Sequence, residues 1–144
     1  MENESRKLEI IQSLGLAVNK FHPLVWIIGE PEIEEGVYIS GFSEINCKGA
    51  KLVIKTGCDI ASFVSINCAD SHKKTLGFQN YIERRDIYIG ENVFIGTHST
   101  IKGGAVIGHH SVIAAGTVVD GEIIPPYSLV SGNPMTIKPN YYIS

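Results

Sequence analysis

The chain has 144 residues, of which 44% are hydrophobic and 19% charged, with a formal net charge of −3. This length and composition predict one ordered domain with a sizeable core. The sequence has no basic stripe of the kind that binds nucleic acid, and no apolar run approaches the roughly 20 residues of a membrane span. Residues 1–7 are too charged for a signal peptide, so we expect a cytoplasmic protein.

The N-terminal segment, residues 1–22, is predicted to contain an amphipathic helix over residues 3–20. Its apolar positions can share one broad face, and they are Leu8, Ile10, Ile11, Leu14 and Val18. His22-Pro23 is expected to end the helix, because the residue before proline is pushed out of the α region. We expect the helix to cap one end of the structure that follows.

A six-residue repeat then dominates the sequence. Aliphatic residues recur at this interval from about Ile27 to Ile66, within a segment spanning residues 23–68. The interval between Ile45 and Ile54 is nine residues, which predicts a small loop over residues 47–51. Six residues matches neither a helix nor plain strand alternation, so the repeat indicates stacked structural units that bury their apolar sides together.

The repeat is absent over residues 69–86, a polar segment that we predict to be a protruding loop with a functional role. It resumes over residues 87–139, where an aliphatic residue stands at every sixth position from Ile89 to Val119. Pro125-Pro126 is expected to break the repeat, and residues 140–144 form a tail. Cys47, Cys58 and Cys68 have no CxxC spacing, which disfavours a disulfide framework or a zinc site, and Cys58 is expected to be a buried thiol.

The final repeats, IGENVFIGTHSTIKGGAVIGHHSVIAAGTVV, followed by IPPYSLVSGNP, resemble the hexapeptide-repeat acyltransferases. They are most similar to the maltose/galactoside O-acetyltransferases and the nucleotide-sugar acetyltransferases. The resemblance implies an all-β fold, a left-handed parallel β-helix with a short N-terminal helix and one protruding loop. It also implies acetyl transfer from acetyl-CoA to a hydroxyl or amine, in homotrimers whose active sites lie between subunits.

The family's catalytic histidine lies at the start of the inserted loop, and His72 occupies that position. An imidazole with an ordinary pKa near 6.5 suits a general base that deprotonates a sugar hydroxyl as it attacks a thioester. The other ring nitrogen needs a partner, for which Asp70 and Glu83 are the candidates.

The same resemblance predicts the acetyl-CoA site. Phe94, Thr97 and Ala115 correspond to the family's donor-lining positions. The chain departs from the family at Asp120-Gly121, where Thr-Lys is common, and in lacking basic residues after the Gly-x-Pro motif. Lys102 and Lys138 are therefore the candidates for contacting CoA phosphates.

The resemblance also implies that the acceptor is a sugar or nucleotide sugar, used in cell-surface polysaccharide synthesis. Arginine suits a diphosphate, and amides suit sugar hydroxyls. The candidate acceptor-binding residues on this basis are Asn46, Asn67, Tyr81, Arg84 and Arg85.

Two other function classes fit a repeat of this kind. A γ-carbonic-anhydrase-like metal enzyme would place a first ligand at His98, but its second ligand position is Gly103, so no metal site is predicted. A non-catalytic β-helix scaffold would need no inserted loop bearing a histidine. His98, His109 and His110 are expected to have structural or interface roles.

Overall fold

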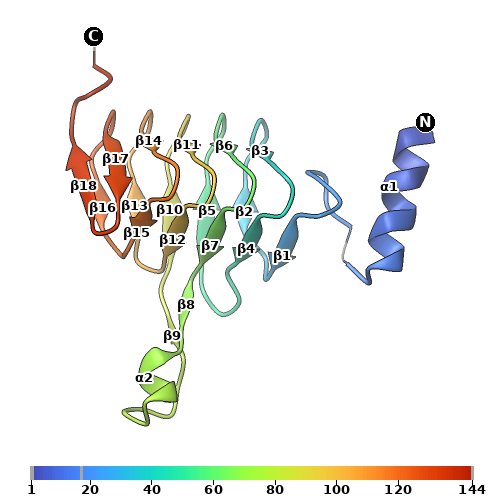
Figure 1. Ribbon diagram of the computed structural model, residues 1–144, viewed down its shortest axis with the longest axis horizontal. Helices are drawn as coiled ribbons and strands as arrows, with labels where there is room; N and C mark the ends of the chain where they lie inside the picture. Colours follow the sequence, from blue (N-terminus) through green and yellow to red (C-terminus); the bar gives the residue numbers. More distant parts are fainter. Residues whose placement is uncertain (1, 17, 144) are drawn as a thin grey trace.

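The computed structural model describes residues 2–16 and 18–143, and the chain forms a parallel β-helix of five coils (Figure 1). Met1, Ala17 and Ser144, which belong to the predicted helical segment and tail, lie outside these described residues. No helix within the described ranges is long and apolar enough to cross a membrane.

Each coil contributes one short strand to each of three parallel sheets, which we call sheets A, B and C. Sheet A contains β1 (Trp26–Ile28), β4 (Glu44–Asn46), β7 (Ser65–Asn67), β12 (Thr100–Lys102) and β15 (Val118–Val119). Sheet B contains β2 (Glu32–Ile33), β5 (Leu52–Ile54), β10 (Ile87–Ile89), β13 (Val106–Ile107) and β16 (Ile123–Ile124). Sheet C contains β3 (Tyr38–Ile39), β6 (Asp59–Ile60), β11 (Phe94–Ile95), β14 (Val112–Ile113) and β17 (Leu129–Gly132), and its last member is the antiparallel β18 (Met135–Lys138).

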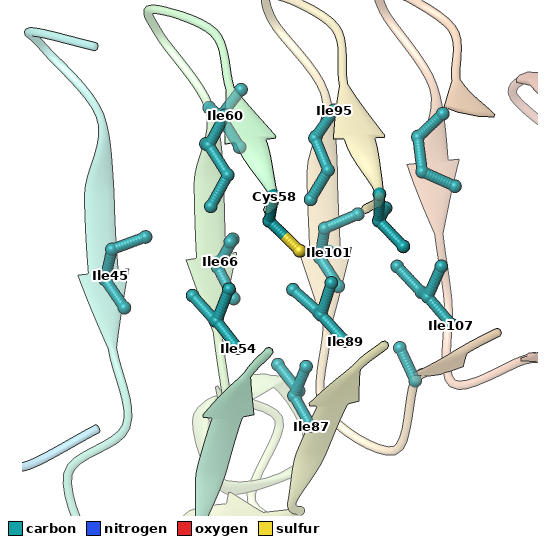
Figure 2. Close-up of a cluster of buried hydrophobic side chains, with 14 of the residues drawn as sticks. Ile45, Ile54, Cys58, Ile60, Ile66, Ile87, Ile89, Ile95, Ile101 and Ile107 are labelled. Carbon is teal, nitrogen blue, oxygen red and sulfur yellow. The ribbon is translucent and has the colours of Figure 1, made fainter. Parts of the chain in front are cut away.

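The six-residue repeat becomes aliphatic ladders inside the coil, because it places one apolar residue at the same point of each strand. In sheet A, Ile45 pairs with Ile66, and Ile66 with Ile101. All three side chains are fully buried and point into the interior (Figure 2). Burying one such side chain contributes roughly 1.5–3 kcal/mol. The predicted all-β solenoid is thereby confirmed.

Each corner of the coil contains a residue in the left-handed backbone region, which turns the chain from one sheet to the next. Glycine supplies this conformation at many corners, but aromatic side chains supply it between sheets C and A. Phe42, Phe63 and His98 have φ values of 66°, 59° and 59° and lie in successive coils. Their rings stack with centroids 5.1 Å apart. At the same corner of the next coil stands Gly116.

Small hydroxyl residues fill the interior beside these corners. Ser43, Ser99 and Thr117 are each at most 1% exposed. Each hydroxyl donates to a backbone carbonyl, with Oγ to oxygen distances of 2.6–3.0 Å. No buried side-chain polar atom in the described residues lacks a hydrogen-bond partner. The hydroxyl groups at the small positions of the repeat are thus hydrogen-bonded within the core.

The N-terminal helix α1 (Glu2–Ser13) is shorter than predicted. It ends well before His22-Pro23, because Gly15 adopts a left-handed conformation (φ 65°) of the kind that terminates helices. The helix lies at the N-terminal end of the stack (Figure 1). Of its predicted apolar face only Ile11 is buried, whereas Leu8, Ile10 and Leu14 remain exposed. Within the helix, the predicted apolar face therefore contributes one buried side chain, that of Ile11.

The prediction that Pro125-Pro126 breaks the repeat was also wrong, since β16 and β17 continue the coil on either side of it. Ile124 and Val130 are at most 1% exposed and extend the aliphatic ladders. Pro125 follows β16 as Gly108 follows β13, and the Gly108 N–H donates to Ile124 O in the next coil. Because β16 is the edge strand of sheet B, a proline without an N–H loses no hydrogen bond there.

Candidate active site

The inserted loop leaves the coil at the corner between sheets A and B, after β7 and before β10. It contains the antiparallel pair β8 (Ala69–Asp70) and β9 (Glu83–Arg84) and the short helix α2 (His72–Thr75). The loop projects away from the stack, as predicted (Figure 1).

The base of this loop rests on the smaller loop predicted from the nine-residue interval, which forms the same corner one coil earlier. Arg84 Nη1 donates to Lys48 O at 2.7 Å, and Lys51 N donates to an Asp86 carboxylate oxygen at 2.9 Å. Gly49 leaves room for this arrangement, since a Cβ there would lie 2.6 Å from Cδ of Arg84. Arg84, a candidate acceptor-binding residue, is therefore held against the neighbouring turn.

His72 and Asp70 form a hydrogen-bonded pair at the start of the loop. His72 Nδ1 lies 2.5 Å from Asp70 Oδ1, and the His72 backbone N–H donates to the same oxygen at 3.2 Å. These two bonds, with weaker support from Lys102, lower the pKa of the Asp70 carboxyl to about 2. An ionised Asp70 holds the proton on Nδ1 and leaves Nε2 as the basic nitrogen. The His72 side chain is 56% exposed, so Nε2 is open to a substrate.

Glu83, the other candidate partner of His72, contacts different side chains. Its carboxylate lies 2.9 Å from Lys73 Nζ and 3.4 Å from Arg85 Nη2. The hydrogen bond from Lys73 is the main reason that the pKa of Glu83 is lowered. The structure thus brings Asp70, and not Glu83, to the imidazole.

Lys102, predicted to contact a CoA phosphate, lies beside this pair. Its Nζ is 3.5 Å from Asp70 Oδ2 and 3.3 Å from Asp120 Oδ1. Desolvation alone would lower the pKa of Lys102, but the hydrogen bonds and charges of Asp120 and Asp70 outweigh it and raise the pKa. Lys102 is therefore a charged link between two carboxylates.

These groups line an open pocket of about 460 Å³ at the foot of the loop. The lining residues are Asp70, His72, Lys73, Glu83, Arg85, Lys102 and Asp120. Asp120 was not among the predicted site residues. The spacing of 18 residues from Lys102, three full repeats, would have placed it at the same corner one coil later.

Two of the remaining candidate acceptor-binding residues lie on the outer face of sheet A beside this pocket. Asn46 pairs in register with Asn67, and Asn67 with Lys102. Each asparagine uses its side-chain oxygen to accept a backbone N–H of the loop that follows it. Tyr81 is 59% exposed on the loop, and Arg85 lies in the pocket wall.

The candidate donor-binding residues lie elsewhere. Phe94 is 41% exposed on the outer face of sheet C. Thr97 and Ala115 follow at the corner between sheets C and A, where Thr97 Oγ1 donates to Ser62 O at 2.7 Å. This corner precedes the strands of sheet A, whereas the corner bearing His72 follows them, so the two corners lie at opposite ends of those strands. Lys138 is exposed on β18, with its Nζ 5.9 Å from the Tyr141 ring centroid. One chain thus does not bring these residues to His72.

The other histidines and the cysteines have structural surroundings. His109 and His110 pack with Tyr127 at the corner between sheets B and C, and His98 belongs to the aromatic stack. Among the described residues, no group of three or more His, Cys, Asp or Glu side chains could hold a metal ion. Cys58 is a free, buried thiol as predicted, and burial raises its pKa.

Comparison with known proteins agrees with this architecture. A sequence model described as bacterial transferase hexapeptide (six repeats) matches residues 86–121. A search of curated proteins finds no match. The matched segment is similar to that family, as the sequence resemblance predicted, and the parallel β-helix extends beyond it on both sides.

Several solved structures share this fold, and those described here are acyltransferases. AntD, an N-acyltransferase from Bacillus cereus in complex with dTDP and 3-hydroxybutyryl-CoA, aligns with a TM-score of 0.71 at 18% identity over 82% of this chain. A maltose O-acetyltransferase from Clostridium difficile 630 aligns with a TM-score of 0.54 at 25% identity over 90% of this chain and 72% of its own. A galactoside acetyltransferase in complex with coenzyme A aligns with a TM-score of 0.63 at 22% identity, over 95% of this chain and 80% of its own. The present chain covers 66% of the length of AntD, just under two thirds.

Proposed function

We propose that the chain is an acetyl-CoA-dependent acetyltransferase that acts on a hydroxyl or amine of a sugar or nucleotide sugar. The observation that carries this proposal is the Asp70–His72 pair, exposed on a loop that projects from a hexapeptide-repeat coil. The bound molecules named for AntD, a CoA thioester and a thymidine nucleotide, support the donor and acceptor classes. A cytoplasmic role in cell-surface polysaccharide synthesis is consistent with such an acceptor.

In this mechanism His72 Nε2 removes the proton of the acceptor hydroxyl or amine as that group attacks the acetyl carbonyl. A bond forms between the acceptor oxygen or nitrogen and the carbonyl carbon. The tetrahedral intermediate collapses, the carbon–sulfur bond breaks, and the CoA thiolate takes the proton back from the imidazolium. Asp70 stabilises that imidazolium through Nδ1, so no covalent enzyme intermediate is needed.

We also propose that the working enzyme is a homotrimer whose sites are shared between chains. The support is the separation described above, with Thr97 and Ala115 before the strands of sheet A and His72 after them. A neighbouring copy would bring its Phe94, Thr97 and Ala115 corner to the His72 pocket. Acetyl-CoA would then lie between two chains.

The first test is release of free CoA thiol from acetyl-CoA across a panel of sugars and amino nucleotide sugars. His72→Ala should lower kcat by roughly 10²–10⁴-fold, the usual contribution of a general base. His22→Ala, a histidine change at a turn before the first strand, is the matched control and should retain activity. Full activity in His72→Ala would eliminate His72 as the base. No turnover and no acetyl-CoA binding by the wild type would favour a scaffold protein instead.

The shared site has its own test in subunit complementation. His72→Ala and Ala115→Trp should each be inactive, the second because a bulky side chain blocks the donor corner. After mixing and exchange of subunits, some interfaces would combine an intact His72 with an intact Ala115, and part of the activity should return. Sedimentation should show a trimer. A monomer with full activity would refute the shared site.

A further inference from the structure

We propose that Lys102 and Asp120 are positioning residues with opposite effects on the protonation of His72 in the Asp70–His72 pair. The Lys102 cation disfavours the imidazolium form, and the Asp120 anion favours it. This inference rests on the proposed role of His72 as the base. It differs from the CoA-phosphate contact predicted for Lys102, and the two roles can be separated by experiment.

The carboxylate of Asp70 is held at both of its oxygens. Oδ1 accepts from His72, and Oδ2 lies 3.5 Å from Lys102 Nζ. A carboxylate fixed at one oxygen alone can rotate about its last bond. Contact at the second oxygen fixes the plane of the carboxylate and so the orientation of the imidazole ring.

Lys102 is well placed for this task, because it comes from the coil and not from the loop. It is the last residue of β12, directly after the fully buried Ile101, and it pairs in register with Asn67 on β7. Its side chain is 37% exposed, which is less than the 56% of His72 or the 70% of Asp120. A rigid strand therefore presents a cation to an exposed loop.

Asp120 counteracts this cation. It follows β15, the strand that pairs with β12, and its Oδ1 lies 3.3 Å from Lys102 Nζ. Asp70, Lys102 and Asp120 thus form a chain of alternating charge, from the loop of one coil across the next two coils. The other charged groups of the pocket, Lys73, Glu83 and Arg85, pair among themselves.

The sign of each residue's effect follows from its charge. Removing the Lys102 cation leaves Asp70 and Asp120 negative, which favours the imidazolium form of His72 and moves the acid limb of the kcat/KM profile to higher pH. Removing the Asp120 anion leaves the cation uncompensated and moves the acid limb to lower pH. Because solvent partly screens these charges, we expect the acid limb to move by about half a pH unit in each direction.

The experiment compares Lys102→Met with Asp120→Asn, and Lys102→Arg serves as the conservative rescue. The pH profile of kcat/KM and the midpoint of the His72 ring signals in NMR should shift up in the first variant, down in the second and little in the third. Lys55→Met is the matched control, since it removes a half-buried lysine that does not line the pocket and whose Nζ lies 3.2 Å from Glu34 Oε2. It should leave both readouts unchanged.

The NMR readout needs no substrate, so it separates this inference from the proposed function. Absence of acetyl transfer with opposed NMR shifts would remove the proposed function and leave the electrostatic arrangement standing. Shifts in the same direction, or no shifts, in the two folded variants would overturn the inference. Weaker acetyl-CoA binding in Lys102→Met without a change in the His72 midpoint would also overturn it, in favour of a phosphate contact.

Discussion

Asp70→Asn is the change that tests the central pair most directly, because it keeps the size of the side chain and removes its charge. The pKa of Asp70 falls from its ordinary value of 3.8 to about 2, and the side chain of His72 is the largest cause. At 1.36 kcal/mol for each pH unit, a fall of this size corresponds to roughly 2 kcal/mol in favour of the charged pair.

That figure is an upper bound on the energy that His72 gains from Asp70. The Asp70 side chain is 27% exposed, and the backbone amide of His72 and the Lys102 cation account for part of the pKa change. Allowing for these contributions and for solvent screening leaves about 1 kcal/mol. Since the imidazolium develops only as the acceptor proton is transferred, we expect kcat to fall roughly five- to tenfold in Asp70→Asn.

The assay is CoA-thiol release at saturating acceptor, with circular dichroism to show that the variant is folded. Glu91→Gln is the matched control, because it makes the same chemical change at an exposed corner between sheets B and C and should retain activity. An Asp70→Asn variant that folds and keeps the wild-type kcat would refute the reasoning, since the pair would then contribute nothing to proton transfer.

Three further predictions concern stability, all measured by urea denaturation. Ile95→Ala should cost about 2–5 kcal/mol and Ile95→Val about 0.5–1.5 kcal/mol, because the side chain is fully buried in its ladder, and equal costs would contradict that packing. Gly96→Ala should cost more, at about 1–3 kcal/mol, than Gly116→Ala, at about 1 kcal/mol. A Cβ at Gly96 meets the Ala115 backbone nitrogen at 2.6 Å, whereas Gly116 has open space and only a left-handed φ of 73° to accommodate. The lowered pKa of Asp70 adds stability above about pH 4 that is lost as the pH falls through 2. The difference in free energy of unfolding between wild type and Asp70→Asn should therefore shrink by about 1 kcal/mol between pH 6 and pH 2. A difference that does not depend on pH would contradict this.

The coil could be predicted from the sequence because a fixed period determines which way each side chain points. Ile89, Ile95 and Ile101 are fully buried, as a six-residue repeat requires. The same reasoning located both interruptions, since any insertion that preserves the ladders must leave the coil at a corner. Both occur at the same corner, between sheets A and B.

The ends of the coil were harder to predict, since local signals compete there with the repeat. The interval from Val119 to Ile124 is five residues, so a strict count of six ends at Val119 although the coil continues. Proline lacks an N–H and usually interrupts a strand ladder, but Pro125 follows the edge strand β16, where an N–H would have no partner. At the other end, the apolar pattern continued to Val18, whereas Gly15 had already ended the helix.

In the candidate site, too, the repeat determines the positions of the residues on the coil but not of those on the loop. His72 could be predicted from its place at the start of the insertion, but its partner could not, because Asp70 and Glu83 both lie on a loop whose fold the repeat does not determine. The positions of the two coil residues of the site could be predicted. Lys102 and Asp120 are separated by three repeats, so their proximity follows from the period alone. The position of Lys102 beside the loop is therefore fixed by the repeat, while the contact between Asp70 and His72 is fixed by two hydrogen bonds within the loop. A change in loop sequence can thus alter the part of the pocket that the loop lines, while the coil keeps Lys102 beside the Asp70–His72 pair.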